Sequence, residues 1–72
     1  MKWLDCLGDI CPVPIMKLQR ELGSMESGEH VMLVTDHSCT LSSTREFCAI
    51  YGLRLEAAEA LPGVWEIEIT KA

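Results

Sequence analysis

Apolar residues recur along the chain with two different spacings, one typical of helices and one typical of strands. Together with the turn residues between them, these spacings predict six short elements. The predicted strands cover residues 3–7, 29–35, 53–57 and 64–70, and the predicted helices cover residues 12–23 and about 44–51. The predicted order along the chain is therefore βαβαββ.

The first predicted helix has one apolar face and ends at Gly23, a residue that favours helix termination. Its apolar face consists of Ile15, Leu18, Leu22 and Met25. In the last predicted strand, Trp65, Ile67 and Ile69 lie on one face and glutamates lie on the other.

The second predicted helix begins near Thr44, because Ser43 followed by Glu46 has the spacing of a capping box. Residues 36–42 are polar and are predicted to form a loop. The residues expected on the buried side of this helix are Thr44, Phe47, Cys48 and Tyr51.

Six elements in a chain this short predict one domain, residues 1–72, of the α+β class. The economical arrangement is a two-layer α/β sandwich, with a four-stranded mixed sheet and both helices on one face. A right-handed first βαβ unit makes the first two strands parallel. The loops after these strands then leave the sheet at the same edge, so Cys11 is predicted to face residues 37–39.

Composition and charge argue against nucleic-acid binding and against membrane insertion. The 72 residues are 49% apolar and 24% charged, with a net charge of −5, so direct nucleic-acid binding is not expected. No apolar stretch is long enough for a membrane span, and Asp5 interrupts any signal-type core, so we expect a cytoplasmic protein without membrane insertion.

Four cysteines, Cys6, Cys11, Cys39 and Cys48, raise the question of disulfides and metals. Cytosolic thiols stay reduced, and no pair has Cys-x-x-Cys spacing. We therefore expect neither a disulfide framework nor a metal site, and no cofactor. Cys6 and Cys48 are expected in the core.

The run Cys11-Pro12-Val13-Pro14 is the most informative segment. Proline is tolerated in the first turn of a helix, so this run is predicted to start the first helix with Cys11 at or beside its N-cap. The free amides of Val13 and Ile15 would then favour a Cys11 thiolate. A second interpretation stays open, in which the prolines only start a helix and Cys11 is a small packing residue.

The run from Leu4 to Pro14, Leu-Asp-Cys-Leu-Gly-Asp-Ile-Cys-Pro-Val-Pro, resembles the signature of the TusA/SirA/YedF sulfur-carrier family. The resemblance extends over essentially the whole chain, and its further matching positions are Gly28, Glu29, Asp36, Phe47 and Gly52. It implies a βαβαββ two-layer fold. It also implies that Cys11 accepts sulfane sulfur as a persulfide and passes it to a partner protein.

The segment after Asp36 departs from this family, many members of which carry an acidic residue and a proline there. This chain has His37 and Ser38, followed by Cys39. The resemblance therefore leaves several partners open, including a cysteine desulfurase, a rhodanese-like protein and a sulfur-transport protein. It equally allows a role in tRNA thiolation, in cofactor synthesis or in the handling of sulfur or selenium compounds.

Residues outside the motif supply further candidates. Cys39 is a candidate second sulfur site or resolving thiol, and His37 is a candidate for holding a thiolate or moving a proton. Asp5 and Asp36 are expected either to accept hydrogen bonds from loop amides or to steer a partner. Lys17 and Arg20 share a helix face that is either simply solvated or meets an acidic patch on a partner.

Three functions are compatible with these residues. The first is a sulfurtransferase-like carrier, whether or not it counts as an enzyme in its own right. The second is a non-catalytic regulatory module that binds a partner protein. The third is a thiol-disulfide switch that uses Cys11 and Cys39.

Overall fold

The computed structural model describes residues 2–72 and contains the six elements in the predicted order. The four strands are β1 (Lys2–Cys6), β2 (His30–Thr35), β3 (Arg54–Leu61) and β4 (Val64–Thr70). The two helices are α1 (Val13–Leu22) and α2 (Ser38–Tyr51). No helix in this described part of the chain is long and apolar enough to cross a bilayer.

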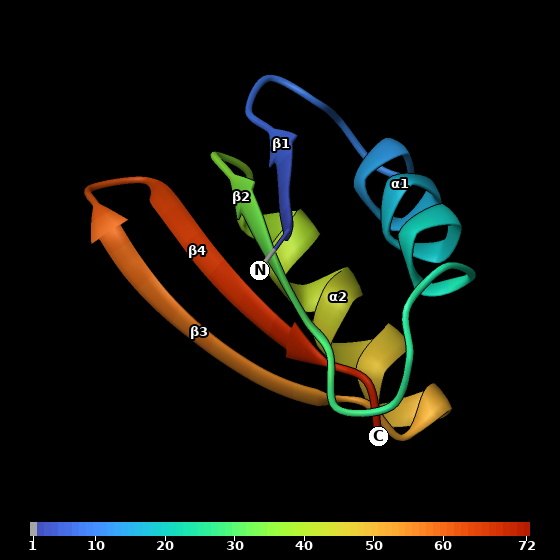
Figure 1. The fold of residues 1–72 in the computed structure, drawn as a ribbon. Helices are drawn as coiled ribbons and strands as arrows, with labels where there is room; N and C mark the ends of the chain where they lie inside the picture. The colour runs from blue at the N-terminus through green and yellow to red at the C-terminus, as the bar shows by residue number, and fades with distance from the viewer. Residues whose placement is uncertain (1) are drawn as a thin grey trace.

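The strands form one sheet in the order β1-β2-β4-β3 (Figure 1). β1 pairs in parallel with β2, whereas β4 pairs antiparallel with both β2 and β3. Both helices pack on the same face of the sheet, as Figure 1 shows. The predicted two-layer α+β sandwich with a four-stranded mixed sheet is therefore confirmed.

The core lies between the sheet and the helices. Val31 and Leu33 of β2 are fully buried, and they pair across the sheet with Ile69 and Ile67 of β4, which are also fully buried. Leu18 of α1 closes this core from the helix layer. Strand residues alternate between the two faces of a sheet, so this register places one apolar row against the helices.

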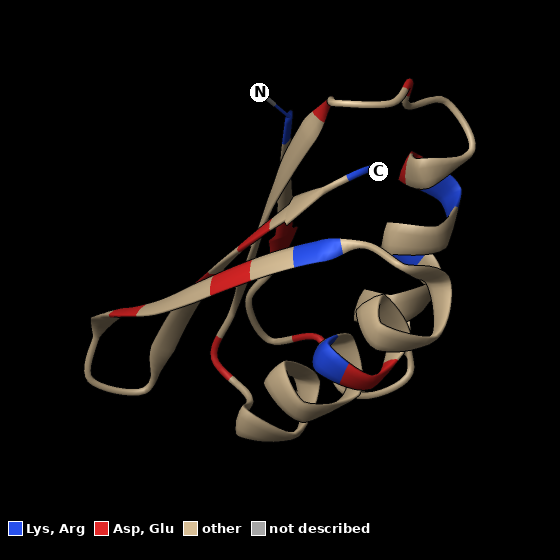
Figure 2. Ribbon diagram, turned by 90° about the horizontal axis from the view of Figure 1, so that it is seen from below, with Lys and Arg blue, Asp and Glu red and all other residues tan. Residues whose placement is uncertain are grey.

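The opposite face of the sheet has no helix and carries acidic side chains. Glu66 and Glu68 of β4 pair with Val34 and Met32 of β2, and Glu56 of β3 lies opposite Glu68. Figure 2 shows acidic positions along the β3–β4 hairpin. The glutamates are therefore placed on the face that water can reach, as the alternating pattern predicted.

The predicted start of the second helix was wrong. α2 begins at Ser38, after His37 as its N-cap, so Ser43 lies inside the helix and forms no capping box. Its buried side repeats every fourth residue as Thr40, Thr44 and Cys48. Small and polar residues occupy this side, so the apolar spacing that reveals most helices is missing at its beginning.

Other boundaries also differ from the predictions. Tyr51 is 63% exposed instead of buried, because it lies in the last turn before Gly52 ends α2 in the left-handed conformation (φ 68°). β3 extends to Leu61 instead of ending near Ala57, since its pairing with β4 continues to the turn at Gly63. The end of β3 is therefore fixed by its pairing with β4, because residues 58–61 lack the clear alternation of apolar and polar residues that predicts a strand.

Candidate functional site

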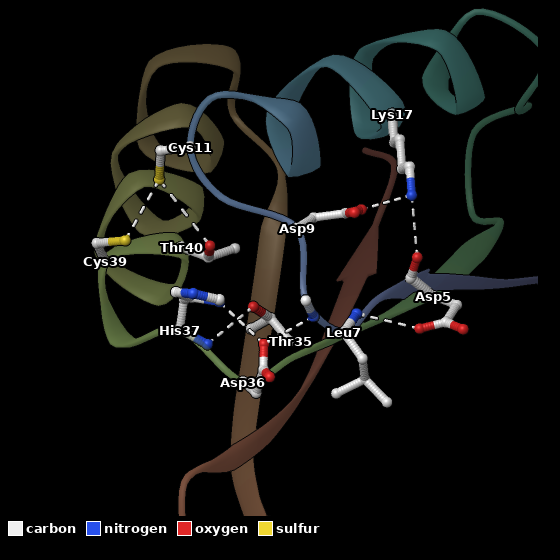
Figure 3. Close-up of polar contacts among 11 residues, drawn as sticks. Asp5, Leu7, Asp9, Cys11, Lys17, Thr35, Asp36, His37, Cys39 and Thr40 are labelled. Atoms are coloured by element: carbon white, nitrogen blue, oxygen red, sulfur yellow. Dashed lines mark hydrogen bonds and ion pairs between the residues drawn. The ribbon is translucent and has the colours of Figure 1, made fainter.

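The loop between β1 and α1 carries Cys11 and is held by two aspartates. Asp5 accepts a hydrogen bond from the Leu7 amide, and Asp36, at the end of β2, accepts one from the Gly8 amide, each at 3.0 Å (Figure 3). Gly8 has φ 79°, a conformation that glycine adopts without strain. The hydrogen bond from the Gly8 amide to Asp36 therefore joins the loop after β1 to the loop after β2.

Lys17 of α1 holds the same loop from the helix side. Its ammonium group pairs with the Asp9 carboxylate and donates a hydrogen bond of 3.1 Å to the carbonyl oxygen of Asp5. The hydrogen bond to Asp9 is the main reason that the pKa of Lys17 is raised. Asp5, Lys17 and Asp36 thus all have intramolecular contacts that fix the loop.

The Cys11 thiol lies against the beginning of α2. Its Sγ atom is 3.5 Å from Cys39 Sγ, 3.8 Å from Ser43 Oγ and 3.9 Å from Thr40 Oγ1. Cys11 and Cys39 are both exposed, and we call them the thiol pair. The parallel β1 and β2 strands bring the thiol pair together, as the topology predicted.

Hydrogen bonds with side chains of α2 lower the pKa of Cys11. The Cys39 thiol, followed by the Ser43 hydroxyl, lowers the pKa of Cys11 below the ordinary cysteine value. The same interaction with Cys11 raises the pKa of Cys39. The Ser43 and Thr40 hydroxyls lower the pKa of Cys11 as well, so the side chains of α2 favour its thiolate.

The predicted source of this stabilisation was wrong. The Val13 amide is occupied by a 3.0 Å hydrogen bond to the Ile10 carbonyl. Within residues 2–72, Cys11 Sγ has its side-chain hydrogen bonds with α2, and none with an amide of α1. Pro12 is the residue before α1 and is joined to Cys11 by a cis peptide bond. Because Cys11 precedes Pro12, its side chain lies outside the first turn of α1.

The Pro12-Val13-Pro14 run does start α1, as predicted. Pro12 occupies the N-cap position, and Pro14, in the first turn, is buried. A proline in this turn needs no hydrogen-bond acceptor for its missing N–H, and its ring here also contributes to packing. The run therefore places Cys11 by starting the helix just beyond it.

His37 lies beside the thiol pair but is engaged elsewhere. Its Nδ1 atom is 2.9 Å from Asp36 Oδ1, and its amide donates to Thr35 Oγ1 at 3.2 Å. The hydrogen bond from the Gly8 amide is the main reason that the pKa of Asp36 is lowered, and His37 contributes less. These contacts give His37 a part in fixing the loop before α2.

Within residues 2–72, Cys11 belongs to no cluster of metal-binding side chains and lines none of the four best-formed clefts. The described residues include no group of three or more His, Cys, Asp or Glu side chains that is able to hold a metal ion. An apolar cleft of about 440 Å³ is present, but it lies between the C-terminal ends of α1 and α2, lined by residues such as Leu22 and Tyr51. The Cys11 side chain is exposed, so another molecule can reach it from solvent.

Comparisons with known proteins show the family of this chain. The family model described as "Sulfurtransferase TusA" matches residues 2–71. This chain belongs to the TusA family. It is also 35% identical over 71 residues to a protein of Methanocaldococcus jannaschii named "Putative sulfur carrier protein", and the match covers 99% of this chain and 95% of that protein.

A solved structure gives the same result for the fold. The crystal structure of a SirA-like protein from Desulfitobacterium hafniense matches with a TM-score of 0.90 and 27% identity, covering 97% of this chain and 96% of that one. Membership of the TusA family supports a sulfur-carrier role, which implies contact with sulfur-donor and sulfur-acceptor proteins.

In this TusA chain, sequence reasoning missed the hydroxyl groups beside Cys11. The sequence predicts Thr40 in a loop and Ser43 at a helix cap, and neither pattern indicates a partner of the thiol. The one available signal was topological, since the loop after β2 was expected to face Cys11. The early start of α2, which brings Ser43 one turn after Cys39, carried no apolar signal.

Exposed apolar side chains near Cys11 were also missed. Ile10 is 65% exposed and Met16 is 58% exposed, and Val13 between them is also exposed. Arg20 lies further along α1 and is exposed as well. Apolar residues exposed next to a reactive group are typical of surfaces that contact other proteins.

Proposed function

We propose that Cys11 accepts sulfane sulfur as a persulfide and relays it to a partner protein. The observation that carries this proposal is the position of Cys11 Sγ, exposed at the surface and within hydrogen-bond distance of a thiol and two hydroxyl groups of α2. These groups favour the thiolate, which is the nucleophilic form of cysteine.

The transfer proceeds in two displacements. The Cys11 thiolate attacks the terminal sulfur of a donor persulfide, the donor's own thiolate leaves, and Cys11 then carries a Cys11–S–SH group. An acceptor thiolate next attacks that outer sulfur and releases the Cys11 thiolate. The Ser43 and Thr40 hydroxyls, 3.8 and 3.9 Å from Cys11 Sγ, are placed to stabilise negative charge at both stages.

Sulfur donors and acceptors would dock around the exposed end of the β1–α1 loop. Ile10 and Met16 supply apolar contact area there, and Arg20 supplies a positive charge on α1. Asp5, Lys17 and Asp36 remain docking candidates, but their first role in this proposal is to hold the loop. A reducing compartment such as the cytoplasm would keep the thiol pair available.

The identity of the donor stays open among a cysteine desulfurase, a rhodanese-like protein and a sulfur-transport protein. His37 and Ser38 replace the acidic residue and proline found after Asp36 in many relatives, and they begin the segment that leads into Cys39. This difference lies next to the thiol pair, so we place donor or acceptor selection there. Handling of sulfur or selenium compounds is therefore as compatible with the site as tRNA thiolation.

Loading of Cys11 is tested in a Cys39→Ser background, in which Cys11 is the exposed thiol that remains. This chain is incubated with a cysteine desulfurase and L-cysteine, with a rhodanese and thiosulfate, or with inorganic polysulfide. We expect mass spectrometry to show one added sulfur atom on Cys11. The matched Cys11→Ser/Cys39→Ser chain should gain none, because Cys6 and Cys48 are buried.

The result that contradicts the carrier proposal is a Cys39→Ser chain to which no donor adds sulfur. A regulatory module that only binds a partner is distinguished from a carrier by the Cys11→Ser chain. It would bind its partner equally well with Cys11→Ser, whereas a carrier with that substitution can dock but transfers no sulfur.

A further inference from the structure

Cys39 has no role in a one-thiol relay, although its position is well defined. It lies in the first turn of α2, it is exposed, and its sulfur is 3.5 Å from that of Cys11. The relay described above uses Cys11 alone, together with thiols supplied by other proteins. A second exposed thiol in contact with the first therefore calls for a function of its own.

We propose that Cys39 discharges the loaded carrier by releasing the bound sulfur as hydrosulfide. This inference rests on the proposed function, because it begins from a persulfide on Cys11. It adds an activity, which is the reduction of sulfane sulfur to sulfide without an external thiol. The chain would then deliver sulfur in two forms, to an acceptor protein or as free sulfide.

The reaction is balanced by the two cysteines themselves. Cys39 Sγ attacks Cys11 Sγ, a bond forms between these sulfurs, and the bond from Cys11 Sγ to the outer sulfur breaks. The outer sulfur leaves as HS⁻ after taking up the proton that Cys39 loses. The two cysteines are oxidised to a disulfide by two electrons, and the sulfane sulfur is reduced by the same two.

The distance between the sulfurs makes Cys11 Sγ the atom that Cys39 reaches. Cys39 Sγ already contacts Cys11 Sγ, whereas the outer sulfur of a persulfide extends one bond further from the protein. Attack on the inner sulfur therefore needs little movement of α2. An acceptor protein approaching from solvent meets the outer sulfur first, so the two outcomes compete at different atoms.

Loading also changes the state of Cys39. In the empty carrier the hydrogen bond with Cys11 and, to a lesser extent, desolvation and the charge of Cys11 raise the pKa of Cys39. In the loaded carrier the negative charge moves to the outer sulfur, one bond further away, and its effect on Cys39 weakens with distance. Loading therefore weakens one of the interactions that raise the pKa of Cys39 in the empty carrier.

The two buried cysteines cannot replace Cys39 in this reaction. Cys6 is fully buried and Cys48 is 2% exposed, and burial raises the pKa of both thiols. Their contacts are with the hydrophobic core. Of the other three thiols in the described structure, Cys39 is the one that lies within hydrogen-bond distance of Cys11.

The experiment compares loaded chains after the sulfur source has been removed. Wild-type, Cys39→Ser and Cys39→Ala chains are loaded with inorganic polysulfide at acidic pH, desalted without added thiol, and transferred anaerobically to pH 8. Released sulfide is trapped with monobromobimane, and the protein mass and number of free thiols are followed over time. Ser42→Ala, an exposed change on the same helix, is the matched control.

We expect the wild-type and Ser42→Ala chains to release one equivalent of sulfide and to lose two free thiols together. The two Cys39 variants should keep their sulfur at least about tenfold longer, because the internal nucleophile is gone. Adding a dithiol such as dithiothreitol should restore both thiols in the wild type and permit a second round.

Two results would overturn the discharge reaction, and they differ in whether the persulfide proposal also fails. If the wild type keeps its sulfur as long as Cys39→Ser does, Cys39 does not discharge the carrier, while the persulfide on Cys11 is unaffected. If neither Cys39 variant gains sulfur at all, the persulfide proposal itself fails, and the discharge reaction fails with it.

Discussion

The four cysteines of this small chain divide into two pairs with opposite environments. Cys6 and Cys48 lie in the core, where burial raises the pKa of each thiol. The thiol pair, Cys11 and Cys39, lies at the surface where β1 and β2 end, and hydrogen bonds lower the pKa of Cys11. The same side chain is therefore a packing group in one region and an exposed thiol, with a lowered pKa at Cys11, in the other.

The difference shows that reactivity here depends on neighbours and not on residue type. Cys6, only five positions before Cys11, points from β1 into the core. Cys11 lies in a loop that Asp36 and Lys17 hold open toward α2. A count of cysteines in the sequence does not distinguish these two environments.

The largest expected contrast between the pairs is in alkylation. In the native chain we expect iodoacetamide to modify Cys11 on the order of 100-fold faster than Cys6 or Cys48, because exposing a core thiol at a local unfolding cost of about 3 kcal/mol leaves it accessible in roughly 1% of molecules. Peptide-resolved mass spectrometry measures the four rates. The contrast should largely disappear in guanidinium chloride, and its survival there would contradict an environmental cause.

The second contrast is in stability. Cys48→Ser buries a hydroxyl group in an apolar site, so we expect the free energy of unfolding to fall by about 1–3 kcal/mol. Cys11→Ser places the same group at the surface and should leave unfolding by urea nearly unchanged. Sulfur loading at position 11 should show the opposite result, because Cys48→Ser keeps the Cys11 thiol and Cys11→Ser removes it. Equal destabilisation by the two changes would show that Cys11 also contributes to the core.

The smallest expected effect is in the pH dependence of Cys11. Its pKa is lowered mainly by Cys39 and next by Ser43, so removing either donor disfavours the thiolate. The midpoint of Cys11 alkylation against pH should therefore move upward in Cys39→Ala and, by a smaller amount, in Ser43→Ala. A downward movement, or none in either variant, would mean that the α2 donors do not control Cys11.

Much of the fold was predictable because it depends on local patterns. The alternating face of β4, the helical spacing of α1 and the glycine after each helix are signals that neighbouring residues carry. The start of α2 was not predictable in this way, because Thr40 and Thr44 form its buried side. Thr44 satisfies its hydroxyl by donating to the Thr40 carbonyl at 2.7 Å, and such a bond leaves no mark in the apolar spacing.

Some features of the candidate site likewise follow from local sequence patterns, and others depend on tertiary packing. The sequence by itself determined that Cys11 precedes a helix-starting Pro-x-Pro run, and that two parallel strands bring its loop to the loop after β2. Only the tertiary structure decided that its thiol is stabilised by Cys39, Thr40 and Ser43 of α2 instead of by amides of α1. The reason is that hydrogen bonds between segments far apart in the chain depend on how helices pack on the sheet, and no local pattern encodes that distance.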